Sequence, residues 1–227
     1  MTASLWTLMA SSVALGFVHT VMGPDHYVPF VAMAKAREWS ARHTLFVTIL
    51  SGIGHVTSSV AIGLAGLVLG MELLKLTALE SARGVIAGWL LFGFGLAYAV
   101  WGLKRALKKP PLTHEHEGVA HTHLGHKGHV HKKANITPWV LFTIFVFGPC
   151  ECLIPLVMYT ATVGGYTAVA IVASTFGVVT VGTMTVIVMA ALRGLELLPR
   201  RNLNRYMHVM AGSIIALCGA GILFLGM

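Results

Sequence analysis

Gly23-Pro24-Asp25-His26 is the stretch that decides how this chain is interpreted, and Gly148-Pro149-Cys150-Glu151 repeats its pattern later in the sequence. Each tetrad interrupts a long apolar segment near its middle. Proline removes a backbone donor from a helix, so each Gly-Pro pair predicts a broken helix. Ionisable or metal-binding side chains follow each break, and at the depth of a bilayer such side chains indicate a functional site.

The composition indicates a membrane protein. Of 227 residues, 56% are hydrophobic and only 11% are charged, whereas a soluble domain carries roughly 25% charged residues. The length suits about six spans of roughly 20 residues each. The net charge of +8 is expected in short loops facing a lipid bilayer, so nucleic acid is not an expected partner. Three cysteines do not make a disulfide framework.

Basic residues predict the orientation. With the N-terminus outside, the inner loops collect fourteen of the sixteen Lys and Arg residues, and only Lys75 and Arg83 stay outside. The positive-inside rule therefore predicts a multi-pass protein with both termini outside. The apolar segments behind this prediction are 2–37, 43–70, 84–104, 136–163, 166–192 and 206–227.

The loop 105–135 differs from the rest of the chain. Seven of the twelve histidines lie within 18 of its residues, and such a tract is typical of a metal-capturing loop. The alternative is a solvated low-complexity linker. We expect this loop to be cytoplasmic and to be an accessory metal site. Its histidines are His114, His116, His121, His123, His126, His129 and His131.

The two tetrads predict an internal repeat. A second match joins Gly54-His55-Val56-Thr57 to Gly177-Val178-Val179-Thr180, and the third and sixth spans are both glycine-rich. Two copies of three helices must have opposite orientations in the membrane. The predicted fold is therefore an all-α polytopic membrane protein of six transmembrane helices. It consists of two inverted three-helix repeats, 1–104 and 136–227, whose first and fourth helices are broken at Gly23-Pro24 and Gly148-Pro149.

Two acids are expected at mid-membrane depth. Asp25 and Glu151 occupy matching places in the repeats, while the other six acids, Glu80 among them, are assigned to loops or span ends. No Lys or Arg is expected at their depth. Because an unpaired carboxylate in hydrocarbon costs several kcal/mol, each must be protonated or bound to a cation.

Nearby donors indicate which cation. His19 and His26 are two helical turns apart and share a face if the helix continues through the break, and His55 lies near the centre of the second span. Imidazole with carboxylate, and a thiolate from Cys150, suits Ni²⁺, Co²⁺, Zn²⁺ or Fe²⁺ better than Na⁺ or Mg²⁺. His55 is alternatively an interhelical hydrogen-bonding residue, and Cys150 a packing residue. Cys152 and Cys218 are interpreted as packing residues.

The stretch from His19 to His26 resembles the histidine and Asp-His signature of the nickel/cobalt transporter group. The chain is most similar to the UreH-like membrane proteins of the superfamily that includes the LysE exporters and the CcdA-type thiol–disulfide carriers. It departs from the nickel transporters in having five residues, not four, between the first His and Asp-His. The resemblance implies a six-helix inverted repeat in a prokaryotic inner membrane, and it supports His19, Asp25 and His26 as site residues.

The predicted function is secondary transport of a divalent transition metal, nickel or cobalt first, by alternating access. The alternatives are an exporter of a small anion or organic solute, a CcdA-type thiol–disulfide carrier, and a metal sensor or assembly partner. The sequence contains no nucleophile–base set and no nucleotide loop, so we do not expect an enzyme. Zinc and iron remain possible cargoes, and a cytoplasmic metallochaperone or a second copy of the chain are possible partners.

Overall fold

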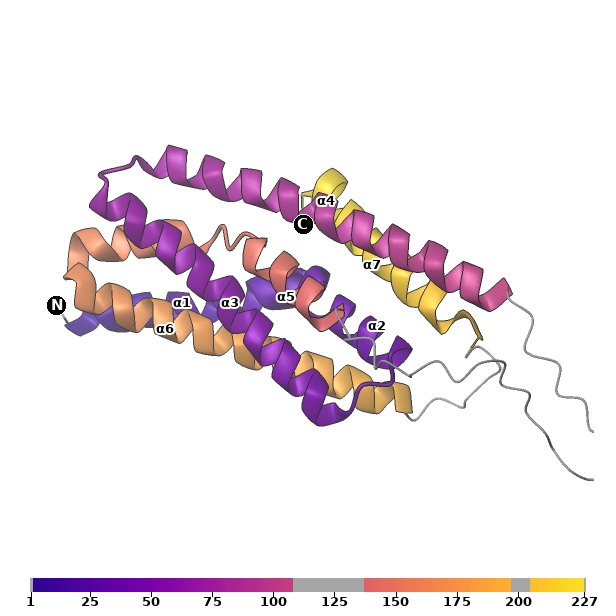
Figure 1. The fold of residues 1–227 in the computed structure, drawn as a ribbon. Helices are drawn as coiled ribbons and strands as arrows, with labels where there is room; N and C mark the ends of the chain where they lie inside the picture. The colour runs from indigo at the N-terminus through magenta and orange to yellow at the C-terminus, as the bar shows by residue number, and fades with distance from the viewer. Residues whose placement is uncertain (1, 108–136, 197–204, 227) are drawn as a thin grey trace, which may run out of the picture.

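The structure, a computed structural model, describes residues 2–107, 137–196 and 205–226 (Figure 1). Throughout this part of the chain the secondary structure is helical, and it contains no strand. The His-rich tract from His114 to His131 lies outside the described residues. The helices are α1 (Thr2–Met22), a 3-10 turn η1 (Pro24–His26), α2 (Val28–Ala36), α3 (Ala41–Val68), α4 (Leu73–Leu107), α5 (Thr137–Phe147), α6 (Leu153–Glu196) and α7 (Met207–Leu225).

Both predicted helix breaks are confirmed. Helix α1 ends before Gly23, whose φ of −94° and ψ of 91° are extended rather than helical, and Pro24 then opens the turn η1. Helices α5 and α6 are separated by residues 148–152, which begin with the second Gly-Pro pair. Pro24 takes the first position of the turn, where no helical N–H is needed, whereas Pro149 lies in the non-helical stretch that precedes Leu153, the first residue of α6.

One other boundary differs from that expected, and one agrees: the gap between the predicted segments 136–163 and 166–192 falls at Gly165. Helix α4 begins at Leu73 rather than near residue 84, so it adds more than two turns at its N-terminus. Helix α6 contains one non-helical residue, Gly165, with φ 70° and ψ −173°. Only glycine adopts such a backbone readily. The chain folds back there (Figure 1), which gives α6 a first arm, 153–164, and a second arm, 166–196.

The helices fit an apolar solvent. In the described part of the chain, α1, α3, α4, α6 and α7 are long and apolar enough to cross a membrane, and α5 is a shorter apolar helix. Large apolar side chains also point outward, as Trp6 (70% exposed), Val178 (74%) and Phe224 (73%) do. In water such a surface would aggregate, whereas in lipid it is the favourable face. The protein is therefore membrane-embedded, and the described part of it is helical.

Helices α4 and α7 pack so closely that only glycine fits between them. A Cβ on Gly95 would lie 2.3 Å from the backbone nitrogen of Ala216, and a Cβ on Gly212 would lie 2.3 Å from that of Ala99. Small residues that let two backbones approach are the usual basis of helix association in membranes. The pairing is antiparallel, because positions early in α4 meet positions late in α7.

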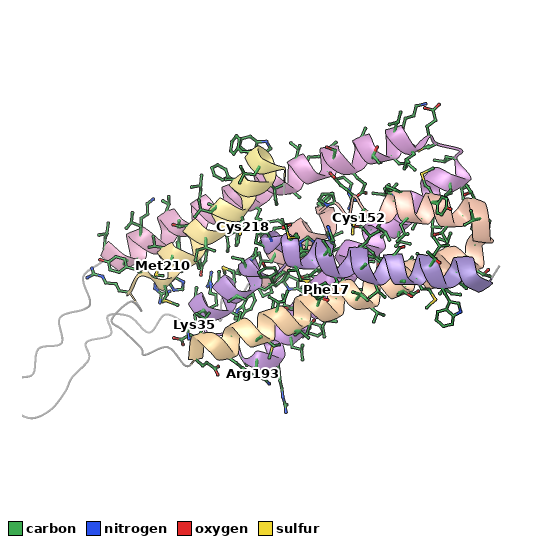
Figure 2. All side chains as sticks on the ribbon, turned by 180° about the vertical axis from the view of Figure 1, so that it is seen from behind. Phe17, Lys35, Cys152, Arg193, Met210 and Cys218 are labelled. Carbon is green, nitrogen blue, oxygen red and sulfur yellow. The ribbon has the colours of Figure 1, made fainter. Side chains whose placement is uncertain are left out.

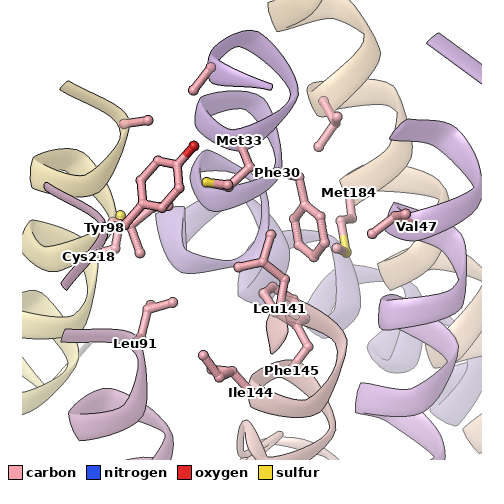
Figure 3. Packing of buried hydrophobic residues seen from close by; sticks show 14 residues of the cluster. Phe30, Met33, Val47, Leu91, Tyr98, Leu141, Ile144, Phe145, Met184 and Cys218 are labelled. Carbon is pink, nitrogen blue, oxygen red and sulfur yellow. The ribbon is translucent and has the colours of Figure 1, made fainter. Parts of the chain in front are cut away.

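A dry core joins the two halves of the chain. Phe30 and Met33 of α2 and Leu141 of α5 are fully buried, and they pack with Leu91 of α4 and Met184 of α6 (Figure 3). This cluster fills the space on one side of the two breaks. It therefore fixes α2 and α5, the short helices, against the long ones.

Basic side chains gather at one end of the molecule. The α2–α3 turn, the end of α4, the end of α6 and the start of α7 all lie toward that end (Figure 1), and Figure 2 shows Lys35 and Arg193 there. Of the nine described basic residues, two lie elsewhere: Lys75 near the start of α4, and Arg83 inside the protein. The basic residues carried by this end are Lys35, Arg37, Arg42, Lys104, Arg105, Arg193 and Arg205.

Candidate metal centre

The first break brings Asp25 and His26 back toward α1. The amide of Gly23 donates to the His19 carbonyl (3.1 Å), and the amide of His26 donates to the Gly23 carbonyl (3.0 Å). Tyr27 donates its hydroxyl to the Val21 carbonyl (3.3 Å). These bonds satisfy the backbone groups that the break exposes, as a low-dielectric environment requires. They also hold the turn in one conformation.

Three imidazoles meet beside this turn. The ligand nitrogens of His19, His26 and His55 all lie within 4.8 Å of one another, and His26 and His55 are buried. The Nε2 atoms of His19 and His26 are 3.1 Å apart. Two nitrogens bonded to one ion at the usual 2.0–2.1 Å are separated by roughly 2.8–3.0 Å in octahedral and roughly 3.3–3.4 Å in tetrahedral geometry. His19 and His26 were predicted to share a face of a continuing helix; the helix ends at Met22, and the turn at the break brings the two rings together instead.

Acceptors behind two of the rings set which nitrogen is free. His26 Nδ1 lies 3.2 Å from both Asp25 Oδ1 and the Gly23 carbonyl oxygen. His55 Nδ1 lies 3.2 Å from the Phe145 carbonyl oxygen. Each Nδ1–H therefore donates, which leaves the Nε2 lone pair as the free ligand atom. Asp25 thus orients His26, in the carboxylate–histidine arrangement common behind metal-binding histidines.

His55 Nε2 is the buried ring nitrogen of the cluster that lacks a hydrogen-bond partner within the described residues. An unsatisfied buried polar atom costs roughly 1–3 kcal/mol, so its presence needs a reason. The His55 ring lies beside the other two, with centroids 6.1 Å from His19 and 5.1 Å from His26, which are themselves 4.6 Å apart. A bound cation would satisfy this nitrogen together with its neighbours.

Aromatic rings and glycines shape the surroundings. The Phe145 ring lies 6.1 Å from His26 and 6.0 Å from His55, and the Phe176 ring lies 6.2 Å from His19. A Cβ on Gly148 would come within 3.1 Å of His55 Nδ1. The second break thus approaches the imidazoles directly, and apolar walls keep the effective dielectric low around them.

The second break contributes sulfur. Cys150 Sγ lies 3.6 Å from His19 Nε2, and both Cys150 and Cys152 have their sulfurs within 4.8 Å of that nitrogen and of each other. Cys150 is fully buried, Cys152 is half-buried, and both are free thiols. Cys152 packs against the apolar cluster of Cys150 and Leu153, as expected of a packing residue, and its sulfur also lies among the donor atoms around His19. The turn that follows Pro149 points both sulfurs toward α1, and sequence spacing alone did not reveal this.

Glu151 lies between these cysteines but points elsewhere. Its side chain is exposed, and it belongs to neither of the two groups of ligand atoms found in the described residues. The predicted set of His19, Asp25, His26, His55, Cys150 and Glu151 is therefore brought together except for Glu151. Alternation of side chains along the 150–152 turn explains the difference.

Glu80 is the buried acid at the second break, and its assignment to a loop or span end is wrong. It is fully buried in α4, where its Oε2 accepts from the Ser59 hydroxyl (3.1 Å) and the Cys150 amide (3.0 Å). The expected absence of a cationic side chain at this depth is also wrong, because Arg83 donates to Glu80. A carboxylate and a guanidinium three residues apart in an apolar helix are the signal that could have revealed this pair.

Arg83 also secures the end of α5. Its guanidinium donates to the Ser58 hydroxyl (2.8 Å) and to the carbonyls of Val146 (2.9 Å) and Gly148 (3.4 Å). The last carbonyls of a helix have no partner within the helix, so a cation there is favourable. The Glu80–Arg83 pair therefore holds the backbone of the second break, as the local hydrogen bonds hold the first.

No protein-family model, no curated protein and no solved structure matches the chain.

Proposed function

We propose that the chain is a secondary transporter of a divalent transition-metal cation, with its central site at His19, His26 and His55. The observation that carries the proposal is the buried, unpartnered Nε2 of His55 beside two further imidazole nitrogens. Neutral nitrogen donors suit Ni²⁺, Co²⁺, Zn²⁺ or Fe²⁺, whereas Na⁺ and Mg²⁺ prefer oxygen. Nickel and cobalt remain the first expected cargoes.

Six crossings in two inverted repeats are part of this proposal. The first crossing is α1 with α2 and the fourth is α5 with the first arm of α6, each interrupted at its Gly-Pro pair. Helix α1 packs on the second arm of α6, where Ser12 donates to the Val172 carbonyl (2.8 Å). Helix α5 packs on α3, where Val146 lies 2.7 Å from a Cβ placed on Gly54. These two pairings exchange under the proposed symmetry, and the antiparallel α4–α7 pair maps onto itself.

Broken helices that meet at the centre of such a repeat favour alternating access. Transporter sites lie where discontinuous helices end at mid-membrane depth. Here both breaks contribute to one cluster, since His26 comes from the first and Gly148 and Cys150 from the second. A movement of one break relative to the other would open the cluster to one side at a time. Asp25, 23% exposed, is the acid placed to exchange a proton for the cation.

Export of an anion is an alternative function, for which Arg83 would be the candidate binding residue. Its positive charge lies inside the protein, but Glu80 neutralises it and its donors are engaged by Ser58 and two carbonyls. An anion would have to displace these partners.

A CcdA-type carrier relays electrons between one cysteine in each repeat. The close pair Cys150 and Cys152 favours thiol chemistry, but the first break carries Asp25 at the matching place.

Transport in reconstituted vesicles tests the proposal. We would follow Ni²⁺, Co²⁺, Zn²⁺ and Fe²⁺ entry with a metal-sensitive dye. His55→Ala and His26→Ala should abolish entry, because each removes a ligand. Asp25→Asn should weaken the apparent affinity about 10–100-fold, as loss of a carboxylate behind a metal-binding histidine does. The matched control is His43→Gln, since His43 is exposed and contacts the Trp39 ring far from the centre. Normal metal entry in the His55 and Asp25 variants would contradict the proposal.

A further inference from the structure

We propose that Cys150, Cys152 and His19 form a second metal position beside the three imidazoles, and that the cargo is therefore a thiophilic metal. This inference rests on the proposed function and narrows its substrate class. Three features of the described residues carry it: the spacing of the donors, the shared histidine, and the way the second break is held.

The spacing fits a metal bound by nitrogen and sulfur. A tetrahedral ion with Zn–S near 2.3 Å and Zn–N near 2.0–2.1 Å places the two donors roughly 3.6 Å apart. Cys150 Sγ and His19 Nε2 are 3.6 Å apart. Cys152 Sγ completes a group whose three donor atoms lie within 4.8 Å of one another. The set has three protein ligands, so one position of a tetrahedral ion stays open for an incoming or leaving ligand.

His19 belongs to both positions. Its Nε2 lies 3.1 Å from His26 Nε2 and 3.6 Å from Cys150 Sγ. A metal held by His19, His26 and His55 can therefore move to the thiolates by exchanging two imidazoles for two sulfurs while it keeps His19. During this transfer the ion stays bound to His19 and is never released into the apolar interior, where a bare charge is very unfavourable.

The two metal positions differ in the charge of their ligands and in the helix break that carries those ligands. Three neutral imidazoles leave a divalent ion with its full charge, whereas two thiolates neutralise it. Binding at the sulfurs breaks two S–H bonds, forms two metal–sulfur bonds and releases two protons, which follows from the need for deprotonated ligands. His26 lies on the first break and the cysteines on the second. Relative movement of the breaks would therefore change which ligand set is complete.

Glu80 acts as a positioning residue for this site. It accepts the Cys150 amide at 3.0 Å, while Arg83 binds the Val146 carbonyl just before the break. An ion pair whose carboxylate is fully buried is a costly way to hold an ordinary turn. Its placement is explained if the direction of the Cys150 side chain must be fixed against His19.

The donor set restricts the cargo. Thiolate and imidazole together suit Zn²⁺, Co²⁺, Ni²⁺ and Cu⁺, and they disfavour Mn²⁺ and Mg²⁺. Zn²⁺, Co²⁺ and Ni²⁺ accept both imidazole and thiolate ligands, so these divalent ions fit both positions. The inference thus excludes the harder divalent ions that a carboxylate-based site would accept.

Cobalt absorption of the full chain tests the inference. Under reducing conditions we would add Co²⁺ and record the near-ultraviolet charge-transfer band that only thiolate ligands produce. Histidines, including those of the loop, give no such band, so the whole protein can be used. The band should appear in the wild type and should be lost in Cys150→Ser and in Cys152→Ser. Because Cys152 is only half-buried, its variant should keep the fold even if the Cys150 variant does not.

Cys218 supplies the matched control. It lies in α7, in the core with Phe30 and Leu91, so Cys218→Ser should keep the full band. His55→Ala should keep it too, because His55 is not a ligand of the second position. A wild type that transports metal without showing the band would overturn the inference and leave the three-imidazole site standing. A band lost in Cys218→Ser would also overturn it. A chain that neither transports metal nor shows the band would contradict both proposals.

Discussion

His26 shows how a single residue can connect backbone, acid and ligand. Its Nδ1 faces the Gly23 carbonyl and Asp25, its Nε2 faces His19, and its ring packs edge-on to His55 and Phe145. Every polar atom of the ring is thus assigned a role by the turn that carries it. Such a ring cannot reorient freely, and pre-orientation of ligands favours tight, selective binding.

Gly23 is required at the first break because of its neighbours. A Cβ at this position would lie 2.5 Å from His26 Nδ1 and 2.9 Å from Asp25 Oδ1. Gly23→Ala should therefore displace both side chains and weaken metal affinity in the transport assay about 10–100-fold, the range for disturbed outer partners. The backbone angles of Gly23 are accessible to alanine, so the helix break itself should persist.

Gly182→Ala is the control for this substitution. Gly182 lies in the second arm of α6, and a Cβ there meets no atom of the described residues within 4 Å. Its metal affinity should equal that of the wild type. Equal affinity of Gly23→Ala and Gly182→Ala would show that the geometry around His26 Nδ1 does not control binding.

At the scale of helices, α4 connects the second break to helix α7. One face of α4 meets α7 through Gly88, Gly95 and Gly102, and its N-terminal part carries Glu80, Arg83 and Gly84 toward the second break. A Cβ on Gly84 would lie 2.9 Å from Pro149 Cγ. Helix α4 therefore fixes the position of the second break relative to α7, and a shift of α4 would be felt at the cysteines.

The α4–α7 contact should respond to a single methyl group. In Gly95→Ala or Gly212→Ala the new Cβ meets backbone atoms at 2.3 Å, and backbone cannot rotate away as a side chain can. The helices must separate, at a cost of about 1–3 kcal/mol. Both variants should show a lower thermal unfolding temperature in detergent. Gly93→Ala is the control, because its Cβ meets no described atom within 4 Å and alanine favours the helix by about 1 kcal/mol. A Gly93 variant less stable than the Gly95 variant would contradict this account.

The sequence predicted those features that depend on residues close together in the chain. Gly-Pro pairs in apolar segments fix the breaks, because proline cannot continue a helix interior. His19 and His26 could be paired from their seven-residue spacing, and His55 from its isolated position in an apolar helix. Glu80 was not placed, because its depth depends on where α4 starts, and the charges of Lys75, Glu80 and Arg83 interrupt the apolar residues of its first turns. Glu151 was expected in the site, and the position of the Cys152 sulfur beside His19 was missed, because both side-chain directions depend on a turn rather than on the helical period.

At the scale of the whole molecule, the apolar and the basic side chains occupy different parts of the surface. Apolar side chains cover the sides of the long helices, while basic residues gather at the end that contains the α2–α3 turn and the start of α7. The imidazoles and cysteines lie between, on the two breaks. This arrangement places a buried polar centre where lipid excludes water on the outside, so access must come from the ends.

The orientation proposed from the basic residues can be tested by labelling. Positively charged loops stay in the cytoplasm, so the end with Arg193 should face inward and the opposite end, with Lys75, outward. Both side chains are exposed, so Lys75→Cys and Arg193→Cys should not disturb the fold. A membrane-impermeant maleimide should label the Lys75 variant in intact cells, and the Arg193 variant only after permeabilisation. The unsubstituted chain, tested in parallel, measures any labelling of the native cysteines. The reverse pattern would place the basic end outside. The histidine-rich segment would then meet metal before the central site during import, rather than collecting it from the cytoplasm.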